Sequence, residues 1–153
     1  MLLYLVQHAE SKSKDEDPAR DLTEKGRRDA ERVARYLKRL HVQVSQIFHS
    51  GKTRARSTAE LLAGQIQPAA VVSEAQGLAP LDDPQIWAAR LANLEEDILL
   101  VGHLPHLGKL ASLLTSGAQE KSVVNFQMGG VVRLRRAEGN WAVDWMLVPD
   151  IVL

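Results

Sequence analysis

Apolar and polar residues alternate along the chain in blocks of two kinds, and the shorter blocks predict strands. Brief apolar runs bounded by polar residues are typical of strands that are buried on both faces. Such runs occur at residues 1–6, 45–48, 69–73 and 98–101. Residues 129–148 show the pattern of two further strands joined at Glu138-Gly139-Asn140, which predicts an antiparallel hairpin.

The longer blocks have the period of an amphipathic helix. In residues 22–40 apolar side chains return every three or four positions, and arginines and lysines occupy the other face. Thr23 is the expected N-cap, with Glu24 near the positive end of the helix dipole. Further helices are expected after Gly51, from Pro84, and from Pro105 to about Gly117. The residues expected to face the core are Ala30, Val33, Ala34, Leu37, Leu40, Ala55, Thr58, Ala59, Leu62, Ile86, Trp87, Leu91, Leu94, Leu107, Leu110, Ala111 and Leu114.

Strands and helices follow one another in turn, which predicts an α/β fold. The expected architecture has three layers, α/β/α, with helices on both faces of a mostly parallel central sheet and the antiparallel hairpin after it. A chain of 153 residues is long enough for one hydrophobic core and short for two. Residues 1–153 are therefore expected to form a single domain.

Composition narrows the possible partners. Nineteen basic and nineteen acidic residues cancel, so no overall field would hold the protein on nucleic acid or on an anionic membrane. The absence of cysteine excludes disulfides, thiolate catalysis and cysteine-ligated zinc. The first apolar run is too short for a signal peptide or a membrane span, so a cytoplasmic location is expected.

Two histidines come directly after predicted strands. His8 follows the first apolar run, His103 follows the run at 98–101, and the turn after the second strand carries Ser50 and Arg54. Because the carboxyl ends of parallel strands meet at one edge of a sheet, these groups are expected to converge on one crevice. An imidazole can attack phosphorus, and a guanidinium matches the oxygens of a phosphoryl group. The pattern therefore predicts a phosphoryl ligand.

Two other interpretations of these stretches are rejected. Gly51-Lys52-Thr53 has the ending of a nucleotide-binding loop, but that motif needs a glycine at position 46, where Gln46 stands. His103 and His106 have the spacing of a helical metal pair, but Pro105 starts the helix after His103. No cysteine or obvious third ligand accompanies them. We therefore expect neither a metal nor a cofactor.

In order and spacing, four stretches resemble the histidine phosphatase superfamily, and the small size of the chain points to its SixA-type phosphohistidine phosphatases. The stretches are QHAE from Gln7, RDLTEKG from Arg20, SGKTRARST from Ser50 and LLVGHLP from Leu99. The resemblance covers nearly the whole chain and implies a phosphoglycerate mutase-like fold with a phosphate pocket.

The resemblance also implies roles for individual residues. His8 takes the position of the nucleophile, Arg54 that of the turn arginine, and His103 that of the second histidine. A further stretch of the family matches at Arg20, Leu22, Thr23 and Gly26, where Asp21 replaces a proline.

Gln7 departs from the family, because the motif has arginine at this position. Glutamine keeps a hydrogen-bond donor but lacks the fixed charge and the planar fork of donors. A charge-assisted hydrogen bond contributes roughly 1.5–3 kcal/mol against about 0.5–1.5 kcal/mol for a neutral one, so turnover is expected to fall about tenfold or more. Arg20 and Lys52 are the candidates to supply part of the missing charge.

The resemblance therefore implies hydrolysis of protein phosphohistidine through a phosphohistidine intermediate on His8. The phosphate would be held by Gln7, Arg20, Ser50, Arg54 and His103, and His103 is expected to be partly protonated beside a dianion. Two alternatives stay open. One is a phosphate- or phosphopeptide-binding module with weak or no turnover, and the other is a phosphatase for small phosphomonoesters. The latter needs a leaving-group acid, for which the candidates are Glu74, Asp82 and Asp83.

Overall fold

The computed structural model describes residues 1–69 and 71–152. Within these ranges lie six strands, four α-helices and one short 3₁₀ helix. The strands are β1 (Leu2–Gln7), β2 (Gln46–His49), β3 (Ser73–Glu74), β4 (Ile98–Gly102), β5 (Val131–Ala137) and β6 (Asn140–Leu147). The helices are α1 (Glu24–Arg39), α2 (Thr53–Ile66), α3 (Pro84–Ala92), α4 (His106–Ser116) and the 3₁₀ helix η1 (Pro149–Ile151).

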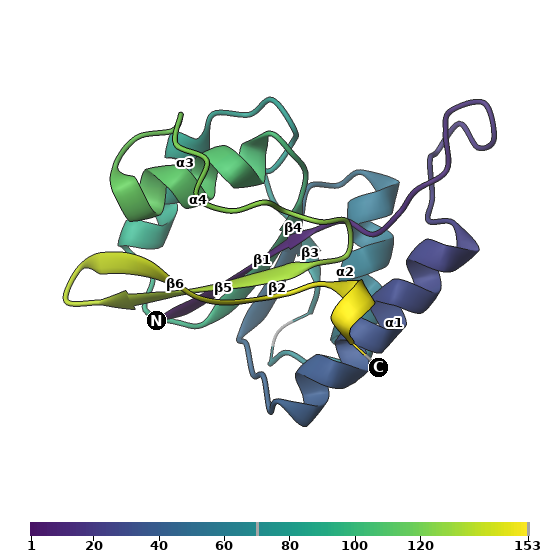
Figure 1. The fold of residues 1–153 in the computed structure, drawn as a ribbon, viewed down its shortest axis with the longest axis horizontal. Helices are drawn as coiled ribbons and strands as arrows, with labels where there is room; N and C mark the ends of the chain where they lie inside the picture. The colour runs from purple at the N-terminus through teal and green to yellow at the C-terminus, as the bar shows by residue number, and fades with distance from the viewer. Residues whose placement is uncertain (70, 153) are drawn as a thin grey trace.

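The strands form one mixed sheet in the order β3-β2-β4-β1-β5-β6 (Figure 1). The first four in this order are parallel, whereas β5 runs antiparallel to β1 and pairs with β6 as a hairpin. Gln7 is level with Gly102, and His49 is level with Val101. The carboxyl ends of β1, β2 and β4 therefore meet at one edge of the sheet, where α/β proteins bind ligands.

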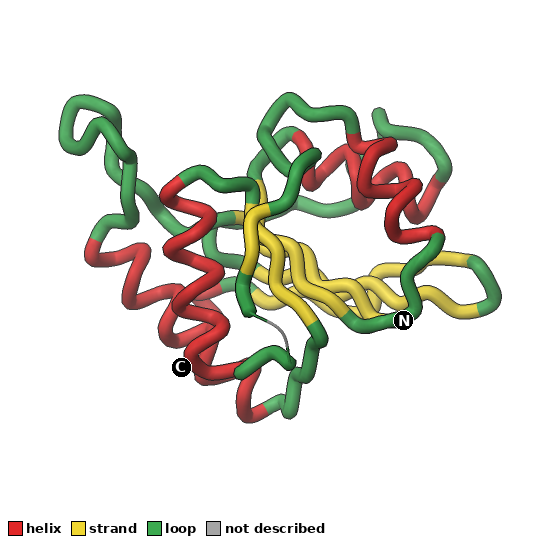
Figure 2. The backbone as a smooth tube through the Cα atoms, turned by 180° about the vertical axis from the view of Figure 1, so that it is seen from behind, coloured by secondary structure: helices red, strands yellow, loops and turns green. Residues whose placement is uncertain are grey.

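Helices cover both faces of this sheet, as Figure 2 shows from behind. Alternate residues of β1 face opposite layers, because Tyr4 and Val6 pack with α1 and α2 while Leu3 and Leu5 pack with α3 and α4. The predicted three-layer α/β/α fold and its terminal hairpin are confirmed. None of the helices in residues 1–69 and 71–152 is long and apolar enough to cross a membrane.

Helix α1 begins as its sequence predicts. The Thr23 side chain accepts a hydrogen bond from the Gly26 backbone N–H at 3.0 Å, so Thr23 is the N-cap. The predicted apolar face is buried except at its end. The prediction is wrong for Leu40, because the helix ends at Arg39 and Leu40 is 46% exposed.

Two further predictions need correction. The third strand is the short Ser73–Glu74 rather than a run centred on Val71 and Val72, and Val71 is 87% exposed. The predicted stretch includes residue 70, which lies outside the described residues. In α3 the Trp87 and Leu91 side chains are buried as expected, but Ile86 is 51% exposed, because Pro84, Trp87 and Leu91 already supply the inward face of this nine-residue helix.

Candidate active site

His8 and His103 lie side by side at the carboxyl edge of the sheet. His8 follows β1, His103 follows β4, and the centroids of their rings are 5.1 Å apart. The His8 backbone N–H donates to the Gly102 carbonyl at 3.1 Å, which extends the β1–β4 pairing up to the two rings. Both histidines are buried. The structure thus brings together the two residues that the sequence predicts at separate strand ends.

The backbone fixes the orientation of the His8 ring. Nδ1 lies 2.8 Å from the Ala9 carbonyl oxygen, which only accepts hydrogen bonds, so Nδ1 donates and Nε2 carries the free electron pair. The Ala9 backbone N–H donates in turn to the Thr58 hydroxyl at 3.0 Å, and that hydroxyl donates to the Arg54 carbonyl at 2.8 Å. Thr58 therefore joins the His8 loop to the helix that carries Arg54. The sequence identified Thr58 only as a core position.

Burial keeps the His8 ring neutral. It lowers the pKa of His8 below the ordinary value, and the positive charges of Arg54 and Arg20 lower it further, against the bond to Ala9. At neutral pH the free Nε2 is therefore a nucleophile of the kind that attacks phosphorus.

His103 is held from the turn after β2. The Ser50 Oγ lies 2.6 Å from His103 Nε2, and the Lys52 backbone N–H donates to the same hydroxyl at 3.3 Å. Burial is the main cause that lowers the pKa of His103 to about 3, and electrostatic repulsion from the protonated form of His8 and from Arg54 acts in the same direction. The ring is therefore neutral at neutral pH, and an anion bound beside it would favour its protonated form.

The same turn brings Arg54 to the site at the start of α2. Gly51 has a φ of +91°, a backbone conformation that L side chains rarely adopt, so the turn favours glycine at this position. Arg54 Nε is buried and has no hydrogen-bond partner among the described residues. Burial and then the charge of Arg20 lower the pKa of Arg54. The unpaired Nε and the lowered pKa are typical of a guanidinium that has no anion bound to it, and a phosphoryl group would be such an anion.

Arg20 lies in the loop between β1 and α1, and its side chain lines a hollow together with Arg54. Its Nε donates to the Lys12 carbonyl at 3.2 Å, and its Nη2 donates to the Ser11 hydroxyl at 3.4 Å. The neighbouring Asp21, which replaces the family's proline, accepts from the Ser57 hydroxyl at 2.7 Å. The loop is thus attached to α2. The two arginines share a hollow of about 680 Å³, which is lined by Lys14, Pro18, Ala19, Arg20, Gly51, Lys52, Thr53, Arg54, Ala79, Pro80, Leu81 and Asp82.

The three candidate acids occupy different places. Asp82 lines the hollow, and its carboxylate accepts from the Ala79 backbone N–H at 2.9 Å. Asp83 is the N-cap of α3 and accepts from the Gln85 backbone N–H at 2.9 Å. Glu74 is exposed and lies against Gly51. Of the three, Asp82 is the one that belongs to the wall of the hollow.

Gln7 is half-buried at the end of β1, level with Gly102. Its backbone carbonyl accepts from the Gly129 N–H at 3.0 Å, which fixes the main chain. Its side-chain Oε1 is buried without a hydrogen-bond partner among the described residues. The backbone pairing of Gln7 with Gly102 sets its main chain directly before the two histidines, His8 and His103.

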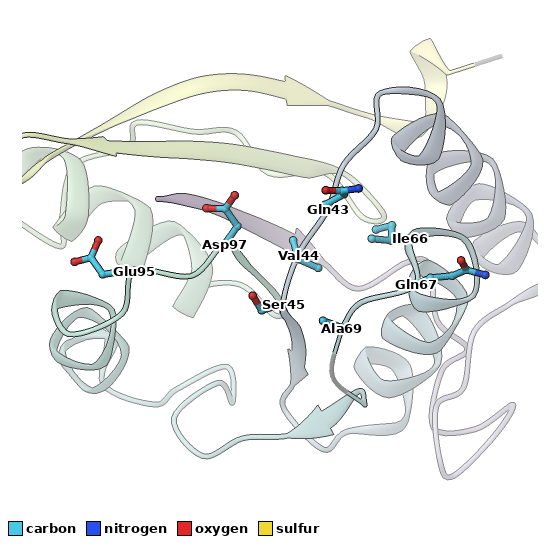
Figure 3. Close-up of a pocket in the computed structure, with 8 residues that line it drawn as sticks. All are labelled: Gln43, Val44, Ser45, Ile66, Gln67, Ala69, Glu95 and Asp97. Atoms are coloured by element: carbon cyan, nitrogen blue, oxygen red, sulfur yellow. The ribbon is translucent and has the colours of Figure 1, made fainter.

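A second hollow, of about 610 Å³, lies at the opposite edge of the sheet and is shown in Figure 3. It contains none of the predicted site residues. Its acidic side chains are Glu95 and Asp97, and Asp97 Oδ1 accepts from the Leu2 backbone N–H at 2.6 Å. This hollow is unsuited to a phosphoryl group because its charges are negative.

Among residues 1–69 and 71–152, no three histidine or acidic side chains are grouped closely enough to hold a metal ion. At the carboxyl edge of the α/β sheet lie a neutral histidine, a second histidine and an arginine that has no anionic partner among the described residues, an arrangement suited to phosphoryl transfer.

Comparison with known proteins agrees with this class. Residues 3–79 match the family model described as histidine phosphatase superfamily, branch 1. An uncharacterized protein of Picosynechococcus sp. is 35% identical over 143 residues, which cover 88% of this chain and 85% of that one. The chain belongs to the histidine phosphatase superfamily.

Solved structures show the same fold. The protein histidine phosphatase SixA complexed with tungstate superposes with a TM-score of 0.88 at 23% identity, covering 98% of each chain. The alpha-ribazole phosphatase from Shigella flexneri superposes with a TM-score of 0.81 at 16% identity, covering 97% of each. The fold is therefore phosphoglycerate mutase-like, and the match of residues 3–79 to the histidine phosphatase superfamily supports a phosphatase.

Proposed function

We propose that the protein hydrolyses phosphohistidine on a protein substrate, with His8 as the nucleophile. The observation that carries this proposal is the orientation of His8, whose Nδ1 is held by the Ala9 carbonyl at 2.8 Å while Nε2 has no hydrogen-bond partner among the described residues and the ring lies beside His103. An imidazole fixed in this tautomer needs no further base before it attacks.

In the first step, His8 Nε2 attacks phosphorus in line with the bond to the substrate's imidazole. The new P–N bond forms as the old one breaks, and the leaving imidazole takes a proton from solvent or carries its own. Arg54, Arg20 and His103 stabilise the charge on the equatorial oxygens, with Gln7 as a neutral donor. Lys52 adds positive charge at the rim of the hollow.

In the second step, water attacks the phosphoryl group on His8. The P–N bond breaks, inorganic phosphate forms, and the electron pair returns to Nε2. The bond from Nδ1 to Ala9 persists through both steps and restores the tautomer needed for the next cycle.

The substrate class rests on the leaving group. A phosphorylated imidazole leaves readily once protonated, whereas an alkoxide requires an acid in the site. Asp83 and Glu74 are placed elsewhere, and the Asp82 carboxylate is bonded to the Ala79 backbone at 2.9 Å. This favours phosphohistidine over a phosphomonoester.

A small phosphomonoester remains the second candidate, because Asp82 lines the same hollow as Arg54 and Arg20. The third candidate, a module that binds phosphate or a phosphopeptide without turnover, follows from the neutral side chain at Gln7.

Turnover of a phosphohistidine protein and of sugar phosphates should be measured side by side, with wild type and Asp82→Asn. The proposal expects the phosphohistidine protein to be hydrolysed faster and Asp82→Asn to have little effect. Faster hydrolysis of sugar phosphates, lost in Asp82→Asn, would establish the phosphomonoesterase. Phosphate binding without hydrolysis of either substrate would establish the binding module.

A further inference from the structure

The hollow that Arg20 and Arg54 share is larger than a phosphoryl group requires. Its volume of about 680 Å³ lies in the range of pockets that hold whole organic ligands, roughly 300–1,000 Å³. Its walls come from three separate stretches of the chain, within residues 14–20, 51–54 and 79–82. A substrate that brings its phosphoryl group to this site therefore has room to contact the outer walls as well.

The charges on these walls are mostly positive. The charged side chains that line the hollow are Lys14, Arg20, Lys52, Arg54 and Asp82. None of the four basic side chains forms an ion pair with an acidic residue in the described part of the chain. The single carboxylate, that of Asp82, accepts a hydrogen bond from the Ala79 backbone N–H. The hollow therefore favours a partner that carries negative charge in addition to its phosphoryl group.

Leu81 lies at the tip of a closed turn in one wall of the hollow. The Asp82 backbone N–H donates to the Ala79 carbonyl at 3.1 Å, and the Asp82 carboxylate accepts from the Ala79 N–H at 2.9 Å. Pro80 restricts the backbone of this turn further. The Leu81 side chain is nevertheless 88% exposed. An apolar side chain that a rigid turn holds in solvent is prepared to bind, because little backbone freedom is lost when a partner covers it.

Lys14 lies in a second closed turn, within the loop that projects from the body of the protein in Figures 1 and 2. The Asp17 backbone N–H donates to the Ser13 carbonyl at 3.0 Å, which closes the turn. The carboxylates of Glu16 and Asp17 accept hydrogen bonds from backbone N–H groups of the same loop. Asp15 lies outside the lining of the hollow. Lys14 is thus the charged side chain that this turn presents to the hollow, and it is exposed.

We propose that the hollow docks a protein segment with acidic and apolar side chains next to the phosphorylated residue, where Lys14 binds a carboxylate and Leu81 contacts an apolar side chain. Exposed apolar anchors surrounded by charged groups are typical of surfaces that bind proteins. Lys14 and Leu81 are specificity-determining residues that take no part in the transfer to His8. The inference rests on the proposed function and specifies which sequence around the phosphohistidine is accepted.

Three probes separate docking from chemistry. They are free phosphohistidine, a peptide with phosphohistidine between glutamate and leucine residues, and the same peptide with lysine and serine at those positions. The ratio kcat/KM should be measured for each probe with wild type, Lys14→Glu and Leu81→Ser. Lys38→Glu and Leu40→Ser are the matched controls, because they change an exposed lysine and an exposed leucine at the end of α1, outside the hollow.

Wild type should use the glutamate and leucine peptide about tenfold better than the lysine and serine peptide, mainly through a lower KM. Leu81→Ser and Lys14→Glu should each lose roughly fivefold or more with the first peptide. The loss in Lys14→Glu should shrink as the ionic strength rises, because salt screens exposed charges. Both variants should hydrolyse free phosphohistidine as wild type does, and both controls should match wild type with every probe.

Equal use of the two peptides by wild type would overturn this inference and leave the proposed function intact. Losses in Lys14→Glu and Leu81→Ser that are equal for the peptide and for free phosphohistidine would also overturn it, because docking affects the peptide alone. Failure of wild type to hydrolyse any of the three probes would overturn the proposed function, and this inference with it.

Discussion

The hydroxyl of Ser50 lies 2.6 Å from Nε2 of His103, so the turn after β2 fixes the ring at the end of β4. Ser50→Ala removes this bond and leaves the ring free to rotate. We expect kcat to fall about tenfold, as for the loss of one hydrogen bond that positions a catalytic group. Ser116→Ala is the matched control, because its hydroxyl bonds the Ser112 carbonyl at the far end of α4.

Nitrogen NMR of the His103 ring separates positioning from a general structural effect. Ser50→Ala should shift the Nε2 resonance of His103 while the unfolding midpoint changes little. An unchanged resonance together with unchanged kcat would remove Ser50 from the site.

Gly26 is required by a close approach between α1 and the loop that follows His8. A Cβ at this position would collide with the carbonyl of Glu10. We expect Gly26→Ala to destabilise the protein by roughly 1–3 kcal/mol and to lower activity, because the backbone that leads to Arg20 must shift.

A methyl group added at Gly64 in α2 would meet no atom of the described residues within 4 Å, so Gly64→Ala should raise stability by about 0.5–1 kcal/mol. Urea unfolding checks both, and equal effects of the two variants would contradict the argument.

His106 makes folding sensitive to acid. Its ring is buried at the start of α4, and neither nitrogen has a partner among the described residues. Burial lowers its pKa from 6.5, while the carboxylates of Asp82 and Asp83 act in the opposite direction. Well above pH 6.5 the ring is neutral in both the folded and the unfolded state. As the pH falls below this value, the unfolded chain takes up a proton before the folded one does, so the unfolding free energy decreases.

The variant His106→Leu removes this titration together with the two buried ring nitrogens that have no partner among the described residues. Its unfolding free energy at about pH 7 should equal or exceed that of wild type, and it should lose less on going to about pH 5. His103 and the carboxylates titrate in both proteins, so the difference between the two isolates His106. Parallel losses in wild type and His106→Leu would contradict the prediction.

Gln7 lacks the positive charge of the family's arginine, which leads to linked predictions for Gln7→Arg and Arg20→Ala. Gln7→Arg should raise kcat about tenfold, since a preorganised cation acts most on the charge of the transition state. Arg20 lines the hollow with Arg54, so Arg20→Ala should lower the activity of wild type more than that of Gln7→Arg. Assays of the four proteins at saturating substrate test this. Equal losses would remove Arg20 from the pocket, and a fall in activity on Gln7→Arg would show that Arg20 already occupies the position.

The positions of the site residues could be predicted from the sequence, because each residue lies directly after a strongly apolar strand or close to the turn that follows one. His8, Ser50, Arg54 and His103 needed only the rule that parallel strands end at one edge. The contacts of Thr58 and Asp21 did not follow, since they join segments that are remote in sequence. Leu40 and Ile86 show a further limit, because apolar periodicity does not indicate where the neighbouring layer ends.

Transfer of the phosphoryl group to His8 Nε2 is the step on which the proposed function depends. A labelled phosphoryl donor should be mixed with wild type, His8→Ala and His103→Ala, quenched under alkaline conditions that preserve phosphohistidine, and mapped by mass spectrometry. Label is expected on His8 in wild type, none in His8→Ala, and slower labelling of His8 in His103→Ala. Equal labelling of wild type and His8→Ala, or label on His103 in wild type, would contradict this expectation.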